Sequence, residues 1–301
     1  MIDGIINVYK ERGYTSFDVC AKLRGILKQK KVGHTGTLDP MAEGVLLVCL
    51  GKATKLVDML VEGDKQYRTT LLLGTKTDTD DVTGNVLSTT KVKEDITDQI
   101  VTETIMGFVG RQKQIPPMYS AIKKDGKKLY EYARAGVNIE REPRDIEIYS
   151  ISDISIDLPR VSFTVKCSKG TYIRSLCRDI GEKLMVGGTM QALIRQDVHG
   201  YTLRDSLTLS QIEQLHSSNN LEEHILPIDS LLCDYPFMRV NNAGKKLLYN
   251  GNKLYPSNFI DINPEIRDND LVRVYDGDNC IAIYKYFLTE QIYKPYKMFL
   301  G

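Results

Sequence analysis

The alternation of apolar and polar side chains predicts a chain built from both strands and helices. Apolar and polar residues alternate with a period of two over residues 146–158 and 161–167, which is typical of half-buried strands. Residues 45–50 are continuously apolar, which is typical of a strand buried on both faces. Strands are predicted at residues 2–8, 45–50, 69–73, 146–158 and 161–167. Helices are predicted from Thr15 onward, over residues 52–61 and 95–109, and along the apolar positions Ile173, Leu176, Ile180 and Leu184. The fold class is therefore α/β (α+β).

The first helix has a start signal of its own. Thr15 precedes Asp18 by three residues, which is the spacing of a capping box. We expect the apolar positions of this helix, Phe17, Cys20, Leu23 and Leu27, to face the core.

The polar loop at residues 33–44 is the first candidate for chemistry. It combines glycines, hydroxyls, one histidine and the carboxylate of Asp39 between two apolar segments. Pro40 restricts Asp39 to an extended conformation, so the carboxylate is held at a bend. Two interpretations remain open from the pattern alone: Asp39 is a helix N-cap followed by Pro40 at the first helical position, or it is a reactive group.

The end of the chain reads as a separate small unit. Residues 217–220 have loop composition, and a second unit follows Pro227. Two strand-like segments flank Asp276-Gly277-Asp278-Asn279, whose composition favours a hairpin turn. We therefore predict a larger domain over residues 1–235 and a small β-rich domain over residues 236–301.

Composition excludes several classes of protein. The chain has 301 residues, of which 42% are hydrophobic and 26% charged, so it can bury a sizeable core. It has neither a signal-peptide pattern nor an apolar run of membrane-spanning length, and we expect no membrane association. Its six cysteines are scattered without metal-ligand spacing. These features predict a cytoplasmic protein with reduced thiols and no metal.

Charge is segregated along the chain although the net charge is only +1. Residues 21–31 hold five basic and no acidic side chains, residues 111–145 hold nine against five, and residues 160–183 hold six against two. These windows together carry +13 and leave −12 on the remainder. Such segregation is typical of a protein with one basic face, which suits a nucleic-acid partner.

Several motifs, in order, resemble those of the bacterial TruB family of tRNA pseudouridine synthases. The loop at 33–44 resembles the aspartate motif of that family, and residues 10–16 resemble its Lys-Pro-x-Gly-x-Ser/Thr-Ser opening, with Glu11 where proline is usual. Further similarity lies at residues 64–68, 120–134, 168–176 and 191–195, so the resemblance covers roughly residues 2–235. It implies a pseudouridine synthase fold with a central mixed, largely antiparallel sheet.

The resemblance also implies a set of site residues. Asp39 would be the catalytic residue, Arg174 its positive partner, and Tyr67 would stack on the target base and take part in proton transfer. Tyr172 and Leu193 would complete the uracil pocket, and His34 would fill the gap left by the flipped nucleotide. The reaction needs no cofactor, because it has no net redox change.

The RNA-binding residues implied by the resemblance are basic. They are Lys10, Lys123, Lys124, Lys127, Lys128 and Arg134, most of them in an insertion at residues 111–145 that would grip the tRNA T arm. The domain at 236–301 would be a PUA-like RNA-binding module. We expect an isomerase that forms pseudouridine at position 55, acting as a monomer without an obligatory protein partner.

Two other functions remain open at this point. The chain could be a tRNA-binding or tRNA-folding protein that has kept the scaffold, which the joint presence of Asp39, Tyr67 and Arg174 disfavours. It could also be a guide-RNA-dependent synthase, which the lack of long basic tails and the presence of the basic insertion disfavour.

Overall fold

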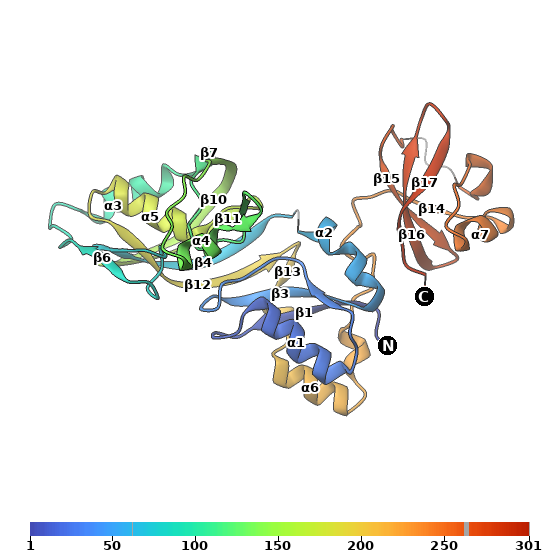
Figure 1. Ribbon diagram of the computed structural model, residues 1–301, viewed down its shortest axis with the longest axis horizontal. Coiled ribbons are helices and arrows are strands. Elements are labelled where there is room, and N and C mark those ends of the chain that lie inside the picture. The colour runs from blue at the N-terminus through green and yellow to red at the C-terminus, as the bar shows by residue number, and fades with distance from the viewer. Residues whose placement is uncertain (62, 262–264, 301) are drawn as a thin grey trace.

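The computed structural model describes residues 1–61, 63–261 and 265–300 of the chain. Figure 1 shows an elongated molecule, with a large mixed unit at one end and a small β-rich unit at the other. The β-rich unit lies within the predicted range 236–301, of which residues 262–264 and 301 are outside the described part. No helix among the described residues is long and apolar enough to cross a membrane.

A nine-stranded sheet forms the centre of the large unit. Its main path runs β1 (Gly4–Lys10), β3 (Glu43–Leu50), β12 (Gly188–Val198), β4 (Lys65–Leu73), β11 (Arg160–Cys167), β10 (Arg144–Asp157) and β7 (Gly110–Gln114), with β2 (Val32–His34) on β3 and β13 (Tyr201–Thr202) on β12. Among the described strands of this sheet, only β3 and β12 pair in parallel. The prediction of a mixed, largely antiparallel sheet is therefore confirmed.

The helices pack on the sheet in two groups. One group covers β1 and β3, and the other covers the strands from β12 to β10. The first is α1 (Ser16–Leu27) and α6 (Leu209–Ser217), and the second is α3 (Asp98–Met106) and α5 (Ile173–Lys183). Shorter elements are α2 (Val57–Leu60) and the 3₁₀ helices η1 (Gly51–Leu56), η2 (Leu203–Asp205), η3 (Leu221–His224) and η4 (Pro256–Asn258).

Helix α1 begins as its sequence predicts but buries a different face. The capping box is present: the Thr15 side chain accepts from the Asp18 amide, and the Asp18 carboxylate accepts from the Thr15 amide. The prediction that Phe17 lies in the core is wrong, since it is 65% exposed beneath the guanidinium of Arg24. The buried stripe starts at Ser16 and continues through Val19, so Phe17 is one position off it.

The predicted helix at 52–61 is instead a 3₁₀ turn, η1, followed by the single turn α2. Its buried residues Ala53 and Leu56 are three positions apart, which is the repeat of a 3₁₀ helix. The predicted helix at 95–109 is present but shorter, as α3.

Strand β3 is buried on both faces, which explains its continuous apolar sequence. Leu46 and Val48 pack with α1 and α6, whereas Leu47 and Cys49 face the opposite way. That opposite side is covered by η1 and by the C-terminal domain.

The C-terminal domain is a four-stranded sheet with one helix. Its elements are β14 (Phe237–Arg239), α7 (Asn242–Tyr249), β15 (Leu271–Asp276), β16 (Asn279–Phe287) and β17 (Ile292–Met298). Asp276 pairs with Asn279, and Gly277 between them has φ +59°, so the predicted hairpin is confirmed.

This domain shares a hydrophobic cluster with the large unit. Phe299 and Ile283 belong to the same buried cluster as Leu47 and Leu56. At the edge of the contact, the Lys297 ammonium lies 2.7 Å from a carboxylate oxygen of Asp58. The two units therefore form one packed structure.

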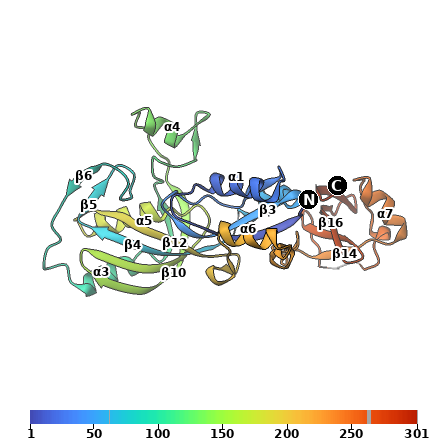
Figure 2. The same ribbon diagram turned by 90° about the horizontal axis from the view of Figure 1, so that it is seen from below.

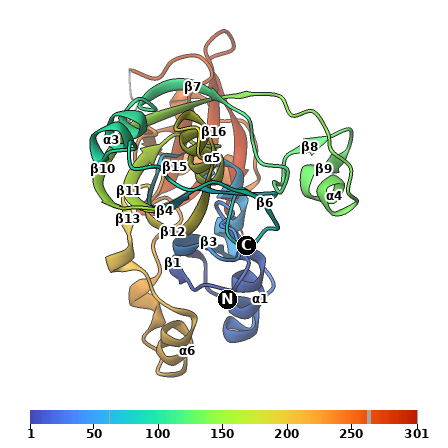
Figure 3. The ribbon, with the colours of Figure 1, turned by 90° about the vertical axis from the view of Figure 1, so that its left-hand side faces the viewer.

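Two hairpins project from the large unit. One is β5 (Thr75–Thr77) with β6 (Val86–Thr89), and the other is β8 (Lys123–Lys124) with β9 (Lys127–Lys128), followed by α4 (Leu129–Arg134). Figures 2 and 3 show α4 standing away from the sheet, on the side where α1 also lies. The basic insertion therefore overhangs one face of the molecule.

We expect Phe299→Ala to lower the free energy of unfolding by about 3 kcal/mol, because it removes a buried aromatic side chain from the cluster shared by both units. Chemical denaturation followed by circular dichroism measures the loss. Phe17→Ala, the same chemical change at an exposed position, is the control and should leave stability within about 0.5 kcal/mol. A loss at Phe299 no larger than at Phe17 contradicts the proposed packing.

Candidate active site

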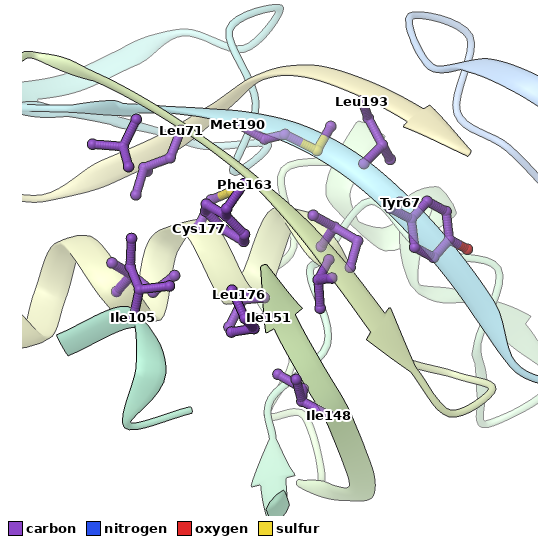
Figure 4. Packing of buried hydrophobic residues seen from close by; sticks show 14 of the residues in the cluster. Tyr67, Leu71, Ile105, Ile148, Ile151, Phe163, Leu176, Cys177, Met190 and Leu193 are labelled. Carbon is purple, nitrogen blue, oxygen red and sulfur yellow. The ribbon is translucent and has the colours of Figure 1, made fainter. Parts of the chain in front are cut away.

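A pocket of about 430 Å³ opens at the end of the main hydrophobic core. It brings together side chains that are far apart in the sequence: Asp39, Tyr67, Tyr172, Arg174 and Leu193. Figure 4 shows Tyr67 and Leu193 at the same end of this core, beyond Phe163 and Cys177. The site therefore combines an apolar wall with a polar mouth.

Asp39 and Arg174 form a two-pronged ion pair in this pocket. The Arg174 Nε lies 2.8 Å from one Asp39 oxygen, and Nη2 donates to the other at 3.2 Å. Arg174 is 4% exposed, whereas the Asp39 side chain is 35% exposed. Arg174 thus holds one side of the carboxylate, and the other side remains open to the pocket.

The remaining donors of Arg174 hold two further segments. Nη1 donates to the Thr79 carbonyl at 3.0 Å, and Nη2 also donates to the Tyr119 carbonyl at 2.8 Å. Because α5 begins at Ile173, the guanidinium projects from the first turn of a helix that is anchored in the core. One side chain therefore fixes three loops around the pocket.

The loop around Asp39 is not a helix start. No helix follows Pro40; the Ala42 amide donates to the Asp39 carbonyl at 3.0 Å in a turn, and β3 then begins at Glu43. The interpretation of Asp39 as a helix N-cap is therefore wrong, because its side chain accepts hydrogen bonds from Arg174 instead of from a helical amide.

Burial raises the pKa of the Asp39 carboxyl, and the nearby charge of Asp81 acts in the same direction. The guanidinium of Arg174 opposes this rise by stabilising the ionised form. With two charge-assisted hydrogen bonds to Arg174, we expect Asp39 to be a carboxylate at neutral pH. The part of the carboxylate that Arg174 does not cover can act as a nucleophile in the pocket.

Two acidic residues near the site, Asp80 and Asp81, were not among the residues proposed from the sequence. Asp81 lies 4.0 Å from Arg174 Nε, and Asp80 pairs with Arg178 at 2.9 Å. Both carboxylates are largely buried, so this loop packs inward on α5. No local pattern could have revealed this, because the partners are almost one hundred residues away.

Tyr67 lies on β4, where alternate residues are buried. Its hydroxyl interacts with the Arg195 side chain, and burial raises the pKa of the hydroxyl while Arg195 opposes that rise.

Tyr172 is positioned through its backbone, since its amide donates to Gln114 at 2.8 Å and its carbonyl accepts from Gln114 at 3.0 Å.

His34 ends β2 and lies outside the residues that line the pocket. It is half-buried, and burial, followed by the charge of Arg195, lowers its pKa. Its Nδ1 is buried without a hydrogen-bond partner among the described residues. The structure thus does not place His34 among the residues that line the pocket with Asp39; it lies at the end of β2, just before the Asp39 loop.

The expectation that Lys10 contacts RNA is wrong. Lys10 is completely buried, and its ammonium donates to the carbonyls of Tyr14 and Ala42 at 2.6 Å and to those of Glu11 and Pro40 at longer range. Burial lowers the pKa of Lys10 to about 8, against the opposing charges of Asp39 and Glu43. Lys10 therefore ties the segment after β1 to the Asp39 loop.

Comparison with known protein families identifies the family of this chain. Residues 24–173 match the model of the TruB family pseudouridylate synthase N-terminal domain, and residues 174–233 match the tRNA pseudouridylate synthase B C-terminal domain. The chain belongs to the TruB family of pseudouridine synthases.

Relatives in the TruB family match almost the whole chain. A tRNA pseudouridine synthase B of Lachnoclostridium phytofermentans is 50% identical over 99% of this chain and 100% of its own length. The protein of the same name from Clostridium kluyveri is 47% identical over 94% of this chain and 95% of its own.

Solved structures agree on the architecture. A Cbf5-Nop10-Gar1 complex contains a chain that is 27% identical, with a TM-score of 0.74, over 99% of this chain and 85% of that one. An archaeal box H/ACA Nop10-Cbf5 complex is similar at 25% identity and a TM-score of 0.73, over 99% of this chain and 86% of that one.

The two TruB family models meet at residue 174, which is not a structural boundary. Strand β12, from the second matched region, pairs with β4 and β3 from the first, and Arg174 itself reaches back to Asp39. The site is therefore assembled across the two matched regions.

The basic insertion of this TruB chain mixes cations with tyrosines. Lys123, Lys127 and Arg134 are exposed, and the Arg134 guanidinium lies over the Tyr130 ring at 5.3 Å. Lys124 and Lys128 are half-buried; Lys124 donates to the Glu140 carbonyl at 2.6 Å. Because Tyr130 also lines the pocket, the insertion reaches from the exposed basic surface to the site.

We expect Lys10→Met to lower the free energy of unfolding by about 3 kcal/mol, since it leaves buried carbonyls without a donor. It should leave the dependence of RNA binding on salt unchanged, because a buried ammonium neutralises no phosphate. Filter binding over a salt series measures this slope, with the exposed Lys22→Met as the stability control. A flatter slope for Lys10→Met would instead indicate that Lys10 contacts RNA directly.

Proposed function

We propose that this chain converts a uridine of tRNA to pseudouridine, with Asp39 as the nucleophile. The observation that carries the proposal is the ion pair of Asp39 with the buried Arg174, open to a pocket beside Tyr67. Isomerisation of a tRNA uridine is also the activity named for relatives that are 44–50% identical to this chain.

The reaction moves one bond and leaves the atoms of the nucleoside unchanged in number. The bond from ribose C1′ to uracil N1 breaks, the uracil turns within the pocket, and C1′ joins C5. The hydrogen of C5 is lost, and N1 gains a proton. No electron donor or acceptor is needed, so the chain's own side chains suffice for this chemistry.

Asp39 is suited to the step at the ribose. Its carboxylate lines the pocket, and it can attack C1′ or assist departure of the base from the same position. Arg174 keeps the carboxylate ionised and oriented in either route. Tyr67 would stack on the turning base, and Leu193 and Tyr172 would enclose it.

The target uridine must leave its stacked loop to reach Asp39, at a cost of a few kcal/mol. The pocket has room for one nucleoside at about 430 Å³, and His34, at the end of β2 and outside the pocket lining, would occupy the vacated space. We propose the T-loop uridine at position 55 as the target, because the basic insertion suits a folded T arm.

The insertion at 111–145 would supply phosphate contacts through Lys123, Lys124, Lys127, Lys128 and Arg134. The domain at 236–301 would act as a PUA-like module that extends the RNA contact. We propose that the chain works as a cytoplasmic monomer on tRNA without an obligatory protein partner.

We expect Asp39→Asn to abolish turnover and leave tRNA binding near that of the unaltered chain. Asparagine keeps the size and hydrogen bonding of the side chain but removes the nucleophile. Tritium release from tRNA labelled at uracil C5 measures turnover, and filter binding on the same sample measures recognition.

Asp98→Asn is the matched control, because Asp98 is an exposed residue at the start of α3, outside the pocket. It should retain full activity. Appreciable turnover by Asp39→Asn would exclude Asp39 as the nucleophile and favour a binding protein.

Alanine at Lys123, Lys124, Lys127 and Lys128 together should weaken tRNA binding and flatten its salt dependence. The logarithmic slope should fall by about 0.7–0.9 for each phosphate that the variant no longer neutralises. The control is the double variant Lys91→Ala and Lys93→Ala, which removes exposed charge elsewhere. An unchanged slope in the fourfold variant would place the T arm on another surface.

A further inference from the structure

Arg195 is a buried cation of the pocket to which the sequence assigns no role. It is 2% exposed and lines the pocket on β12, two positions beyond Leu193. In the pairing of β12 with β4 it lies directly opposite Tyr67, so both side chains project to the same face of the sheet.

The guanidinium of Arg195 links three segments of the site. Nε donates to the Val45 carbonyl of β3 at 2.7 Å, and Nη2 donates to the Gly36 carbonyl of the Asp39 loop at 3.2 Å. The third contact is the Tyr67 hydroxyl. The backbones approach closely here: a Cβ on Gly44, at φ +106°, would lie 2.2 Å from the Arg195 carbonyl oxygen.

Arg195 has no carboxylate to neutralise it. Within residues 1–61, 63–261 and 265–300, Asp39 pairs with Arg174, and Arg195 takes part in no ion pair. Its titratable hydrogen-bond partner in these ranges is the Tyr67 hydroxyl, whose pKa is raised by burial, and the other titratable groups that its charge affects, Lys10 and His34, carry no negative charge. An isolated buried charge is costly, and where one is kept at a site it indicates a function.

A negative charge develops in the same pocket during the reaction proposed above. When the C1′–N1 bond breaks, its electron pair stays on uracil, and Asp39 becomes bonded to C1′ or takes up a proton. The departing base is then an anion in a pocket that holds two guanidiniums: Arg174, whose partner Asp39 loses its charge in this step, and Arg195, which has no carboxylate partner at any stage. Fixed positive charge at that point lowers the barrier without any reorganisation.

We propose that Arg195 is a positioning residue that holds Tyr67 and the Asp39 loop together and stabilises the negative charge of the departing uracil. This inference rests on the proposed function. Arg195 transfers no proton in the step: it is an arginine, protonated throughout, and its field acts on the base directly and through the Tyr67 hydroxyl.

A change of leaving group separates charge stabilisation from a structural role. Fluorine at C5 makes uracil a better leaving group, so a T-arm stem-loop with 5-fluorouridine at the target position depends less on Arg195. We expect Arg195→Gln to slow single-turnover consumption of uridine about 100-fold and that of 5-fluorouridine by less than 10-fold. Nuclease digestion and chromatography measure the N1-linked nucleoside that remains in each substrate.

Arg195→Lys is the second variant, because it keeps the positive charge and loses the planar guanidinium that donates several hydrogen bonds at once. It should fold even if the glutamine variant does not, and it should slow uridine less than Arg195→Gln does, with the same preference for 5-fluorouridine. An equal slowing of both substrates in the variants that fold would overturn the charge role, as would full activity. Turnover by the unaltered chain in the same assay keeps the proposed function independent of that outcome.

Discussion

The ion pair between Asp39 and Arg174 is the constraint on which the site depends. Burial raises the pKa of the Asp39 carboxyl, so its ionised form needs a compensating positive charge. Arg174 supplies the compensating charge from α5, a helix packed on the same hydrophobic core as the Asp39 loop. Its other donors then order the loops at Thr79 and Tyr119. The pocket is therefore built around one buried guanidinium.

Where the chain is irregular, buried cations donate the hydrogen bonds that backbone amides donate in regular secondary structure. Lys10 donates to carbonyls of the segment after β1 and of the Asp39 loop, and Arg195 holds the same loop from β12. Loop carbonyls in a core need donors, and long basic side chains reach them where no neighbouring strand can. Rigidity of the loop thus comes from side chains belonging to distant strands, which suits a site that must be preorganised.

The parallel pairing of β3 with β12 brings two walls of the pocket together. It places the end of the Asp39 loop beside Leu193 and Arg195, while the antiparallel neighbour β4 brings in Tyr67. On the other face, β3 packs against η1 and the C-terminal domain, so that domain contributes to the core that supports the site. The segment from β8 to α4, by contrast, stands away from the sheet (Figure 3).

Local pattern determined the elements of this protein: the capping box at Thr15, the doubly buried β3, the alternating β10 and β11 and the hairpin at Gly277 follow from propensity and periodicity. The motif residues Asp39, Tyr67 and Arg174 could be proposed from resemblance alone. Only the tertiary structure decided which charges are buried. Lys10 is buried, and Asp80 and Asp81 lie against arginines of α5. The tertiary structure likewise decided that Phe17 is exposed. The reason is physical: periodicity reports which face a residue takes, whereas the burial of a charge depends on a partner that the fold brings from elsewhere in the chain.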